Sequence, residues 1–251
     1  MSDYTENKDN PSMHIAVFTG GAYPEPEKTK NYWNAVSKPD LVIAADSGLE
    51  TLQKYTACFP DTVSAPDRIL GDMDSISDMH LIDTYPPAIV AKYKTDKDLT
   101  DTELALTYGY EKSEGRTRFV TLVGGDGGRV DHFLGIYDLF STDLHPDAWL
   151  CRDQMLLYLE KDTSVFFRCE NEKDYISISR LNGNRSGGSI HTEGLEWEYP
   201  VFRKTGMPSI SNRMKKSWYT SGRNAEISVT EGTFIVILPV TAAVEYRRKG
   251  K

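Results

Sequence analysis

The first 150 residues of the chain repeat one arrangement: a short apolar run, then glycine or aspartate, then a stretch of helical character. The apolar runs occupy residues 14–19, 41–45, 67–70 and 117–123, with a weaker one at 89–90. The helical stretches fall around residues 29–37, 48–55, 101–112 and 131–140. Strands that alternate with helices are typical of a mostly parallel, doubly wound sheet, which binds ligands beyond the carboxyl ends of its strands.

After about residue 150 the pattern changes to short apolar runs separated by glycine, asparagine and serine. Strands are expected within residues 154–168 (two strands around a turn), 175–181, 190–199, 225–229 and 233–238. No helix is expected in this part, and residues 203–223 are expected to form a long loop or an irregular hairpin. Short strands with turn signals favour a small β-sandwich.

We therefore predict an α/β fold class: an N-terminal doubly wound, mostly parallel sheet domain followed by a C-terminal all-β sandwich domain. The expected boundaries are residues 13–150 and 151–251, and residues 1–12 are expected to be a disordered tail.

Charge and cysteine content narrow the classes of function. The net charge of −8 argues against a general nucleic-acid binder, whose affinity would come from a basic face. The three cysteines lie far apart without a CxxC motif, so neither a disulfide framework nor a structural zinc site is indicated. No apolar run approaches the ~20 residues that cross a bilayer. We expect a cytoplasmic protein that binds neither nucleic acid nor a membrane.

The first polar cluster spans residues 71–75, with the sequence Gly-Asp-Met-Asp-Ser. Residues i and i+2 of an extended segment point the same way, so Asp72 and Asp74 can present two carboxylates to one point. Hard oxygen ligands of this kind suit Mg²⁺. The alternative for so short a pattern is an aspartate-rich turn with solvated charges.

The second cluster spans residues 94–106. Thr100 and Glu103 form a capping-box signature, so a helix should begin near Asp101. Asp98 and Asp101 would then flank a helix N-terminus, where backbone N–H groups also attract anions. In the alternative interpretation Asp101 only complements the helix dipole and Asp98 is a loop charge.

The third cluster, residues 124–132, places four glycines in five residues between a strand and a helix. Such a segment lets the backbone approach a bulky anion, and Arg129 could bind phosphate oxygens. The pattern is neither GxGxxG nor a P-loop, so a Rossmann or Walker site is not indicated. A glycine-rich turn without a ligand is the alternative, and His132 is either a base or a structural hydrogen-bonding group.

Together these clusters resemble the signatures of the thiamine pyrophosphokinase family: an aspartate-serine-glycine turn, GD-x-DS, D-x-D-x-TD-x-E and GG-x-GGR-x-DH. They stand here in the same order at residues 46–48, 71–75, 96–103 and 124–132. A further signature at residues 192–197 is followed by residues 209–212, segments that form much of the thiamine pocket in that family. The resemblance covers roughly residues 14–240.

The resemblance implies a nucleotide-binding catalytic domain, a thiamine-binding sandwich domain, and a homodimer with active sites between subunits. It implies transfer of the pyrophosphoryl group of ATP to the hydroxyl of thiamine, with Mg²⁺ as cofactor. The implied catalytic residues are Asp72, Asp74, Asp98 and Asp101, of which Asp72, Asp74 and Asp101 would hold the metal. The implied ATP and phosphate ligands are Asp46, Ser47, Thr100, Gly125, Gly127, Gly128, Arg129, Asp131 and His132. The implied thiamine ligands are Trp197, Ser209, Ser211 and Asn212.

Two departures from the family pattern leave questions open. Ile136 stands where the family usually has asparagine, so a polar contact near the nucleotide is either missing or supplied elsewhere. Residues 213–219 lengthen the link after Asn212, so either Trp197 or Trp218 could cover thiamine, and Trp197 could equally be a core residue.

The basic residues of that link also allow two interpretations. Arg213, Lys215 and Lys216 either help to hold phosphate at a partner subunit's nucleotide site or form a solvated loop surface. Two alternative functions are the same chemistry on another acceptor, such as a pterin alcohol, and a catalytically silent binding protein.

Overall fold

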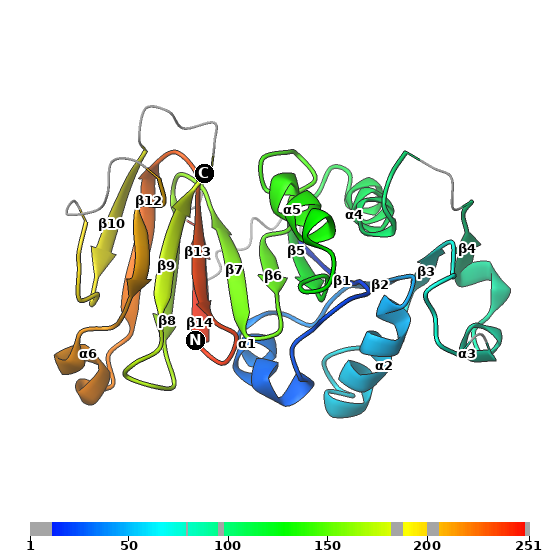
Figure 1. Ribbon diagram of the computed structural model, residues 1–251, viewed down its shortest axis with the longest axis horizontal. Coiled ribbons are helices and arrows are strands. Elements are labelled where there is room, and N and C mark those ends of the chain that lie inside the picture. Colours follow the sequence, from blue (N-terminus) through cyan, green and yellow to red (C-terminus); the bar gives the residue numbers. More distant parts are fainter. Residues whose placement is uncertain (1–11, 79, 95–97, 182–187, 200–205, 249–251) are drawn as a thin grey trace. The chain divides into compact units, whose positions relative to one another are not determined.

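The computed structural model describes residues 12–78, 80–94, 98–181, 188–199 and 206–248 (Figure 1). Within these residues the chain divides into two compact units. Residues 12–27 and 37–152 form the first, called here the α/β unit, and residues 28–36 and 153–248 form the second, the β unit. The expected boundary between two independent domains at residues 150 and 151 stays a prediction. Most of the expected N-terminal tail lies outside the described residues.

Parallel strands form the centre of the α/β unit. They lie side by side in the order β6, β5, β1, β2, β3, β4. Their bounds are β1 (Met13–Phe18), β2 (Leu41–Ala45), β3 (Arg68–Gly71), β4 (Val90–Lys92), β5 (Arg118–Val123) and β6 (Ala148–Leu150). Every residue of β1 and β2 is buried, as expected of parallel strands that are covered on both faces. Strand β6 was not anticipated.

Helices cover both faces of this sheet. They are α2 (Gly48–Cys58), α4 (Asp101–Lys112) and α5 (Val130–Leu139), with the short α3 (His80–Asp83) and the 3₁₀ turn η2 (Pro87–Ile89). In Figure 1, α4 and α5 lie on one side of the strands and α2 on the other. Helix α4 begins as predicted: Glu103 N donates to Thr100 Oγ1 at 3.2 Å, and Thr100 N donates to Glu103 Oε2 at 2.8 Å.

The β unit contains two antiparallel sheets. One has the order β11 (Ser209–Asn212), β9 (Ile176–Arg180), β13 (Phe234–Pro239), β7 (Gln154–Leu159). The other has the order β10 (Ser189–Glu193), β12 (Ala225–Glu231), β8 (Thr163–Arg168), β14 (Ala243–Arg248). Buried and exposed residues alternate along much of β8, β10 and β12, as they do when one face of a sheet packs on a core. The predicted fold class is confirmed.

A helical segment from the N-terminal half belongs to the β unit. The 3₁₀ turn η1 (Pro26–Thr29) leads into α1 (Lys30–Ala35), which packs near β14. Tyr32 and Trp33 are buried, and Asn31 Nδ2 donates to the carbonyl of Thr241 at 2.7 Å. Buried aromatic surface therefore holds this helix against strands that lie far away in the sequence.

Two expectations for the β unit are wrong. The strand expected at residues 190–199 ends at Glu193, because a turn begins at Gly194, whose φ is +90°. Residues 203–223 are not all loop: those that are described include β11 and the helix α6 (Lys216–Ser221). A strand as short as β11 and a helix as short as α6 depend on packing against neighbouring elements, which local sequence does not reveal.

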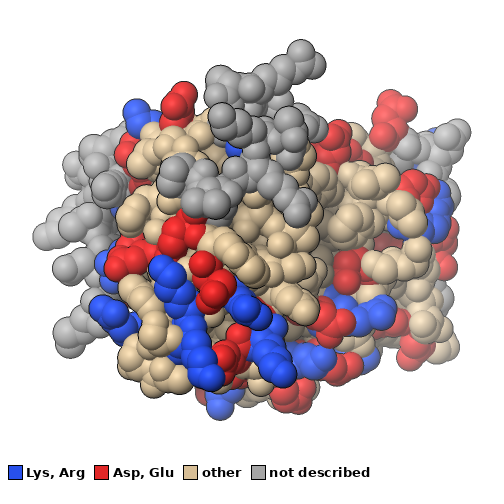
Figure 2. Space-filling model, turned by 60° about the vertical axis from the view of Figure 1, so that its left-hand side comes forward, with Lys and Arg blue, Asp and Glu red and all other residues tan. Residues whose placement is uncertain are grey.

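Charges of both signs share the face of the molecule shown in Figure 2. On β14, Arg247 pairs with Glu245 at 2.9 Å and Arg248 with Glu160 at 2.7 Å. Exposed pairs of this kind contribute at most ~1 kcal/mol each to stability. No helix among the described residues is long and apolar enough to span a membrane.

Candidate active site

A cluster of three carboxylates lies at the carboxyl ends of β2 and β3. One carboxylate oxygen from each of Asp46, Asp72 and Asp74 lies within 4.8 Å of the other two. Because Ala45 and Leu70 are paired in parallel register, the residues that follow these two strands emerge side by side. The structure thus brings Asp72 and Asp74 together and adds Asp46, which the resemblance had implied only as a nucleotide ligand.

Asp46 is the most constrained member of this cluster. It is only 8% exposed, and its φ of +49° lies in the left-handed region. Its Oδ1 atom is buried without a hydrogen-bond partner among the described residues. Burial raises the pKa of its carboxyl group, opposed by hydrogen bonds from Ser75 and the backbone of Ser47 and reinforced by the charges of Asp101 and Asp72. An unpartnered buried oxygen beside two further carboxylates is a donor set that fits a hard divalent cation.

Asp101 lies beside this cluster. A β-carbon built on Gly71, whose φ is +141°, would lie 3.1 Å from Asp101 Oδ1 and 3.1 Å from the Asp46 β-carbon. Glycine at position 71 therefore lets the start of α4 approach the end of β3. Asp98 is exposed and belongs to no carboxylate group of this kind among the described residues. The motif residue Asp96 lies outside the described residues.

An open cleft of about 770 Å³ contains part of the cluster. Its lining residues are Asp72, Met73, Asp74, Ile76, Lys92, Tyr93 and Lys94. Lys92 and Lys94 are exposed and bring positive charge to the wall of an acidic cleft. Sequence reasoning assigned no role to either lysine, although both lie shortly after the weak apolar run at residues 89–90 and Lys94 begins the second polar cluster.

The glycine-rich segment after β5 packs closely against the segment after β1. Gly124, Gly125, Gly127 and Gly128 all have φ between +79° and +92°. The N–H of Ala22 donates to the carbonyl of Asp126 at 2.9 Å, which joins the two segments.

Within this segment the glycines have different surroundings. A β-carbon at Gly125 would lie 2.6 Å from Ile136 Cδ1, whereas one at Gly128 would meet nothing within 4 Å. Gly125 is therefore required for packing, and open space lies beside Gly128. Ile136 itself is buried, so apolar packing occupies the position where the family usually has asparagine.

The polar residues after the glycines are paired with one another. Arg129 Nε donates to Asp131 Oδ1 at 3.1 Å, and the N–H of His132 donates to the same oxygen at 3.1 Å. The hydrogen bonds from Arg129 lower the pKa of the Asp131 carboxyl group to about 2. In this arrangement the Arg129 guanidinium bonds to the Asp131 carboxylate through Nε and one terminal nitrogen, so part of its donor capacity is already used.

Two further residues implied as phosphate ligands have local roles. The Thr100 hydroxyl belongs to the capping box of α4. The Ser47 hydroxyl lies so close to Gly20 that a β-carbon there would approach within 2.3 Å of its oxygen. The Ser47 side chain lies beside the segment that follows β1, and Thr100 directly precedes Asp101 in the chain.

In the β unit, Trp197 is 50% exposed and is therefore not a core tryptophan. The guanidinium carbon of Arg213 lies 5.7 Å from the centre of its ring system, within cation–π range. Ser209 is buried, and Ser211 is exposed with a φ of +57°. The indole thus presents a surface that already attracts a planar cation.

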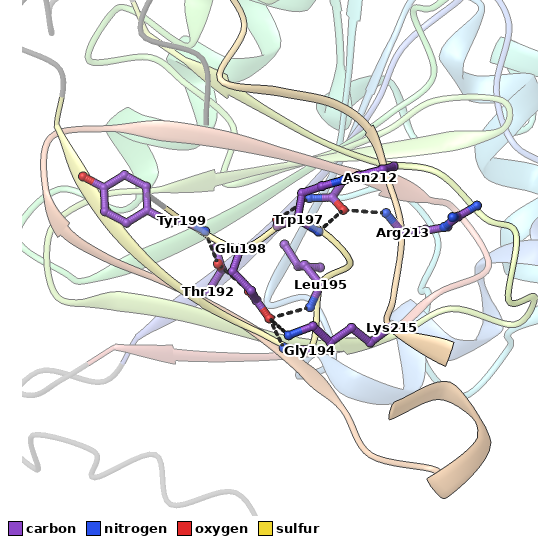
Figure 3. Close-up of polar contacts among 9 residues, drawn as sticks. All are labelled: Thr192, Gly194, Leu195, Trp197, Glu198, Tyr199, Asn212, Arg213 and Lys215. Carbon is purple, nitrogen blue, oxygen red and sulfur yellow. Dashed lines mark hydrogen bonds and ion pairs between the residues drawn. The ribbon is translucent and has the colours of Figure 1, made fainter. Parts of the chain in front are cut away.

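Asn212 is fully buried, and its carboxamide is bonded to the backbone of Trp197 (Figure 3). Its Nδ2 donates to the carbonyl of Trp197 at 2.8 Å and to Ser209 Oγ at 3.2 Å. Its Oδ1 accepts from the N–H groups of Trp197 at 3.2 Å and Arg213 at 2.9 Å. These bonds use both donors and both acceptor sites of an asparagine side chain. Asn212 therefore holds Trp197 in place and has no capacity left for a ligand.

Trp218 and the basic link residues are engaged within the chain. A β-carbon at Gly194 would lie 2.6 Å from Trp218 Cε3, so the Trp218 indole packs directly on this glycine. Lys215 Nζ pairs with Glu198 Oε1 at 3.0 Å, and Arg213 lies over Trp197. Of the two tryptophans, Trp197 offers the more open surface, and two of the three link cations already have intrachain partners.

The fold and these side chains define a class of protein: an α/β unit with a carboxylate cluster at its strand ends, of which Asp46 is buried, in one chain with an antiparallel β unit. Residues 30–147 match the model of the thiamin pyrophosphokinase catalytic domain. This part of the chain is similar to the catalytic domain of thiamine pyrophosphokinases, and the resemblance inferred from the sequence is confirmed.

Individual relatives agree with this assignment. Thiamine pyrophosphokinase of Bacillus subtilis (strain 168) is 36% identical over 86 residues, a match that spans 34% of this chain and 38% of the relative. The crystal structure of the Bacillus subtilis enzyme has a TM-score of 0.61 at 22% identity and covers 90% of this chain and 98% of its own. Thiamin pyrophosphokinase of Candida albicans has a TM-score of 0.57 at 16% identity, over 91% of this chain and 89% of its own. At these identities the two structures show a shared fold.

Proposed function

We propose that this protein is a Mg²⁺-dependent thiamine diphosphokinase, which transfers the pyrophosphoryl group of ATP to the hydroxyl of thiamine and releases AMP. The observation that carries the proposal is the buried Asp46 Oδ1, which has no hydrogen-bond partner within the described part of the chain and lies beside Asp72 and Asp74. These three residues lie within the segment that matches the catalytic domain. An aspartate cluster of this kind has a clear use beside a polyphosphate and little use in a protein that only binds an organic ligand.

Asp46, Asp72 and Asp74 would hold the Mg²⁺, with Asp101 beside them. Once bound, the cation would neutralise the negative charge of the phosphate chain and polarise it toward attack. Asp98, in the loop before α4, is proposed to be a further catalytic residue. Lys92 and Lys94 on the cleft wall add positive charge within reach of phosphate oxygens.

The reaction is a displacement at phosphorus. The thiamine hydroxyl oxygen bonds to the β-phosphorus of ATP and loses its proton to solvent, the bond from that phosphorus to the bridging oxygen of the α-phosphate breaks, and AMP leaves. Such transfers require mostly positioning and stabilisation of charge. The glycine-rich segment contributes to positioning, because open space beside Gly128 allows a phosphate to approach the backbone. Gly127, Arg129, Asp131 and His132 are proposed to border the same phosphate-binding region.

Trp197 is proposed to hold thiamine, whose thiazolium ring is planar and cationic. Attraction between a cation and an indole face contributes ~0.5–2 kcal/mol, and Arg213 already shows that this ring attracts a planar cation. The Ser211 hydroxyl is exposed on β11 and is proposed as a hydrogen-bond partner of the aminopyrimidine. Ser209 and Asn212 are proposed to stabilise the pocket, because Asn212 bonds both to Ser209 and to the backbone of Trp197.

We also propose a cytoplasmic homodimer with active sites between subunits. Each unit supplies half of what the reaction needs: carboxylates and lysines in one, an aromatic platform in the other. Mixing Asp72→Asn with Trp197→Ala, under conditions where subunits exchange, should restore roughly a quarter of wild-type activity, because heterodimers contain one site with two intact halves. No recovery after proven exchange would mean that each chain builds its own site.

The proposed activity is tested by AMP release from ATP. We expect release to depend on both thiamine and Mg²⁺ and to stop on addition of a chelator. Turnover with a pterin alcohol in place of thiamine would favour the alternative acceptor. Thiamine or ATP binding without any AMP release would favour a silent binding protein.

A further inference from the structure

Residues 194–197 form a turn, and the carboxylate of Glu198 accepts hydrogen bonds from its backbone. Glu198 Oε1 accepts from the N–H groups of Gly194 at 2.9 Å and Leu195 at 3.0 Å. The same oxygen pairs with Lys215 Nζ at 3.0 Å, and Oε2 accepts from Thr192 Oγ1 at 2.6 Å. Figure 3 shows these contacts converging on one side chain. Glu198 therefore ties both ends of the turn to a single point.

The chain makes this bonding possible by its local conformation. Gly194 adopts a φ of +90°, which turns successive N–H groups toward the Glu198 carboxylate. The turn is also joined to the following segment: Glu196 N donates to the carbonyl of Arg213 at 2.9 Å, and Lys215 N donates to the carbonyl of Gly194 at 2.8 Å. Hydrogen bonds to the Glu198 carboxylate and between backbone groups therefore stabilise the turn together.

Asn212 stabilises the backbone of Trp197 directly, and Glu198 stabilises the turn before it. Asn212 bonds both the N–H and the carbonyl of Trp197, while Glu198, the next residue along the chain, anchors the turn that leads into it. The indole itself remains half exposed. A rigid backbone beneath an open aromatic ring is the arrangement expected of a preorganised binding surface.

We propose that Glu198 is a positioning residue for substrate binding: it fixes the turn of residues 194–197 so that the Trp197 indole is preorganised to receive a planar organic cation. The proposal rests on the proposed function, in which that cation is thiamine. Glu193 directly precedes this turn and Glu196 lies within it, and both side chains are exposed. The side chain of Glu198 is only 25% exposed, and among these three glutamates its carboxylate is the one whose hydrogen bonds hold the turn. A carboxylate bonded to both backbone N–H groups and an ammonium group is well suited to this task, because charge-assisted hydrogen bonds are stronger than neutral ones.

The test compares thiamine and nucleotide in Glu198→Ala. We expect the dissociation constant for thiamine, measured without nucleotide, and the KM for thiamine both to rise about tenfold. We expect the KM for ATP to stay within about twofold, because Glu198 lies in the unit that does not hold the carboxylate cluster. Glu198→Gln should recover most of the affinity, since its amide oxygen still accepts from the backbone N–H groups. Lys215→Met should cost less than Glu198→Ala, since it removes only the ion pair.

Glu245→Ala is the matched control, because Glu245 is a glutamate of the same unit that also pairs with a basic side chain, at 39% exposure. An unchanged thiamine affinity in Glu198→Ala, equal increases of both KM values, or an equal loss in Glu245→Ala would overturn the positioning role. If Glu198→Ala does not fold, Lys215→Met decides, because it removes the ion pair to Glu198: a thiamine-specific loss of affinity supports the proposal, and wild-type affinity for thiamine overturns it. A wild-type protein that releases no AMP would instead overturn the proposed function.

Discussion

The terminal carbon of Ile136 occupies the space that a β-carbon on Gly125 would need, at a separation of 2.6 Å. Gly125 also has a φ of +85°, in a region that residues other than glycine rarely adopt. The glycine-rich segment and α5 are thereby matched to each other at a position where the family pattern differs. A side chain at position 125 would have to displace either the helix or the loop.

Gly125→Ala should therefore destabilise the protein by about 2–4 kcal/mol, from overpacking and left-handed strain together. Ile136→Ala alone leaves a cavity, but combined with Gly125→Ala it should recover part of the loss, because the clash is removed and the strain remains. Thermal or denaturant unfolding of the two single variants and the double variant measures this coupling. Strictly additive effects would show that the two positions are independent.

Asp46→Asn should abolish most turnover and at the same time stabilise the metal-free protein near neutral pH. The folded-state pKa of Asp46 is raised, so its charge opposes folding above the ordinary carboxyl pKa, and the neutral amide removes that penalty. Asparagine tolerates the left-handed backbone at this position. Unfolding midpoints with chelator and with Mg²⁺ provide the check: the stabilisation by Mg²⁺ seen in wild type should disappear. A variant that keeps it would remove Asp46 from the metal site.

Asp72→Asn and Asp74→Asn should each lower kcat strongly while leaving the unfolding midpoint nearly unchanged. Neither side chain lies in the apolar core, and Asp74 is exposed. Loss of a group used mainly in the transition state lowers kcat more than it raises KM. Turnover at the wild-type level in either variant would contradict its assignment.

Lys92→Gln and Lys94→Gln should raise the KM for ATP by a few fold each, and the effect should shrink at high salt. Exposed charges contribute at most ~1 kcal/mol and are screened by ions. Lys161→Gln, in the turn between β7 and β8, is a control that removes the same charge elsewhere. Identical KM values for ATP in the cleft variants and the control would exclude the lysines from phosphate binding.

Trp197→Ala should raise the KM for thiamine far more than the KM for ATP. The indole is half exposed, so its loss should leave the unfolding midpoint close to that of wild type. Steady-state kinetics with each substrate varied in turn separates the two constants. Equal increases in a well-folded variant would place Trp197 outside the thiamine pocket.

Titration of His14 should make the protein less stable as the pH falls below about 6.5. Burial is the main cause that lowers the pKa of this side chain from its usual 6.5. His14 Nδ1 donates to the carbonyl of Ser37, so Nε2 is left to accept from the Thr121 hydroxyl at 2.9 Å, which requires a neutral ring. Below pH 6.5 the unfolded chain binds the proton more readily than the folded one, so protonation favours unfolding. His14→Gln should flatten this part of the curve of unfolding free energy against pH. An unchanged slope in that variant would assign the pH dependence to other groups.

Local sequence determined the elements themselves, because helix and strand periodicity and capping depend on residues close together in the chain. The capping box at Thr100 and Glu103, the helix that follows it and the strand at residues 41–45 all appear where the pattern predicts them. The choice of Asp72 and Asp74 as neighbouring carboxylates also followed from local geometry, because two residues i and i+2 share a face.

Tertiary structure alone decided which distant residues meet. Asp46 joins Asp72 and Asp74 because β2 and β3 pair in parallel register, and Lys92 reaches the same cleft because β4 pairs with β3. Likewise, the role of Glu198 depends on the left-handed turn at Gly194 and on a lysine seventeen residues further along the chain. The bonds that hold these residues form only when segments far apart in sequence come together, so no local pattern of residue types specifies them.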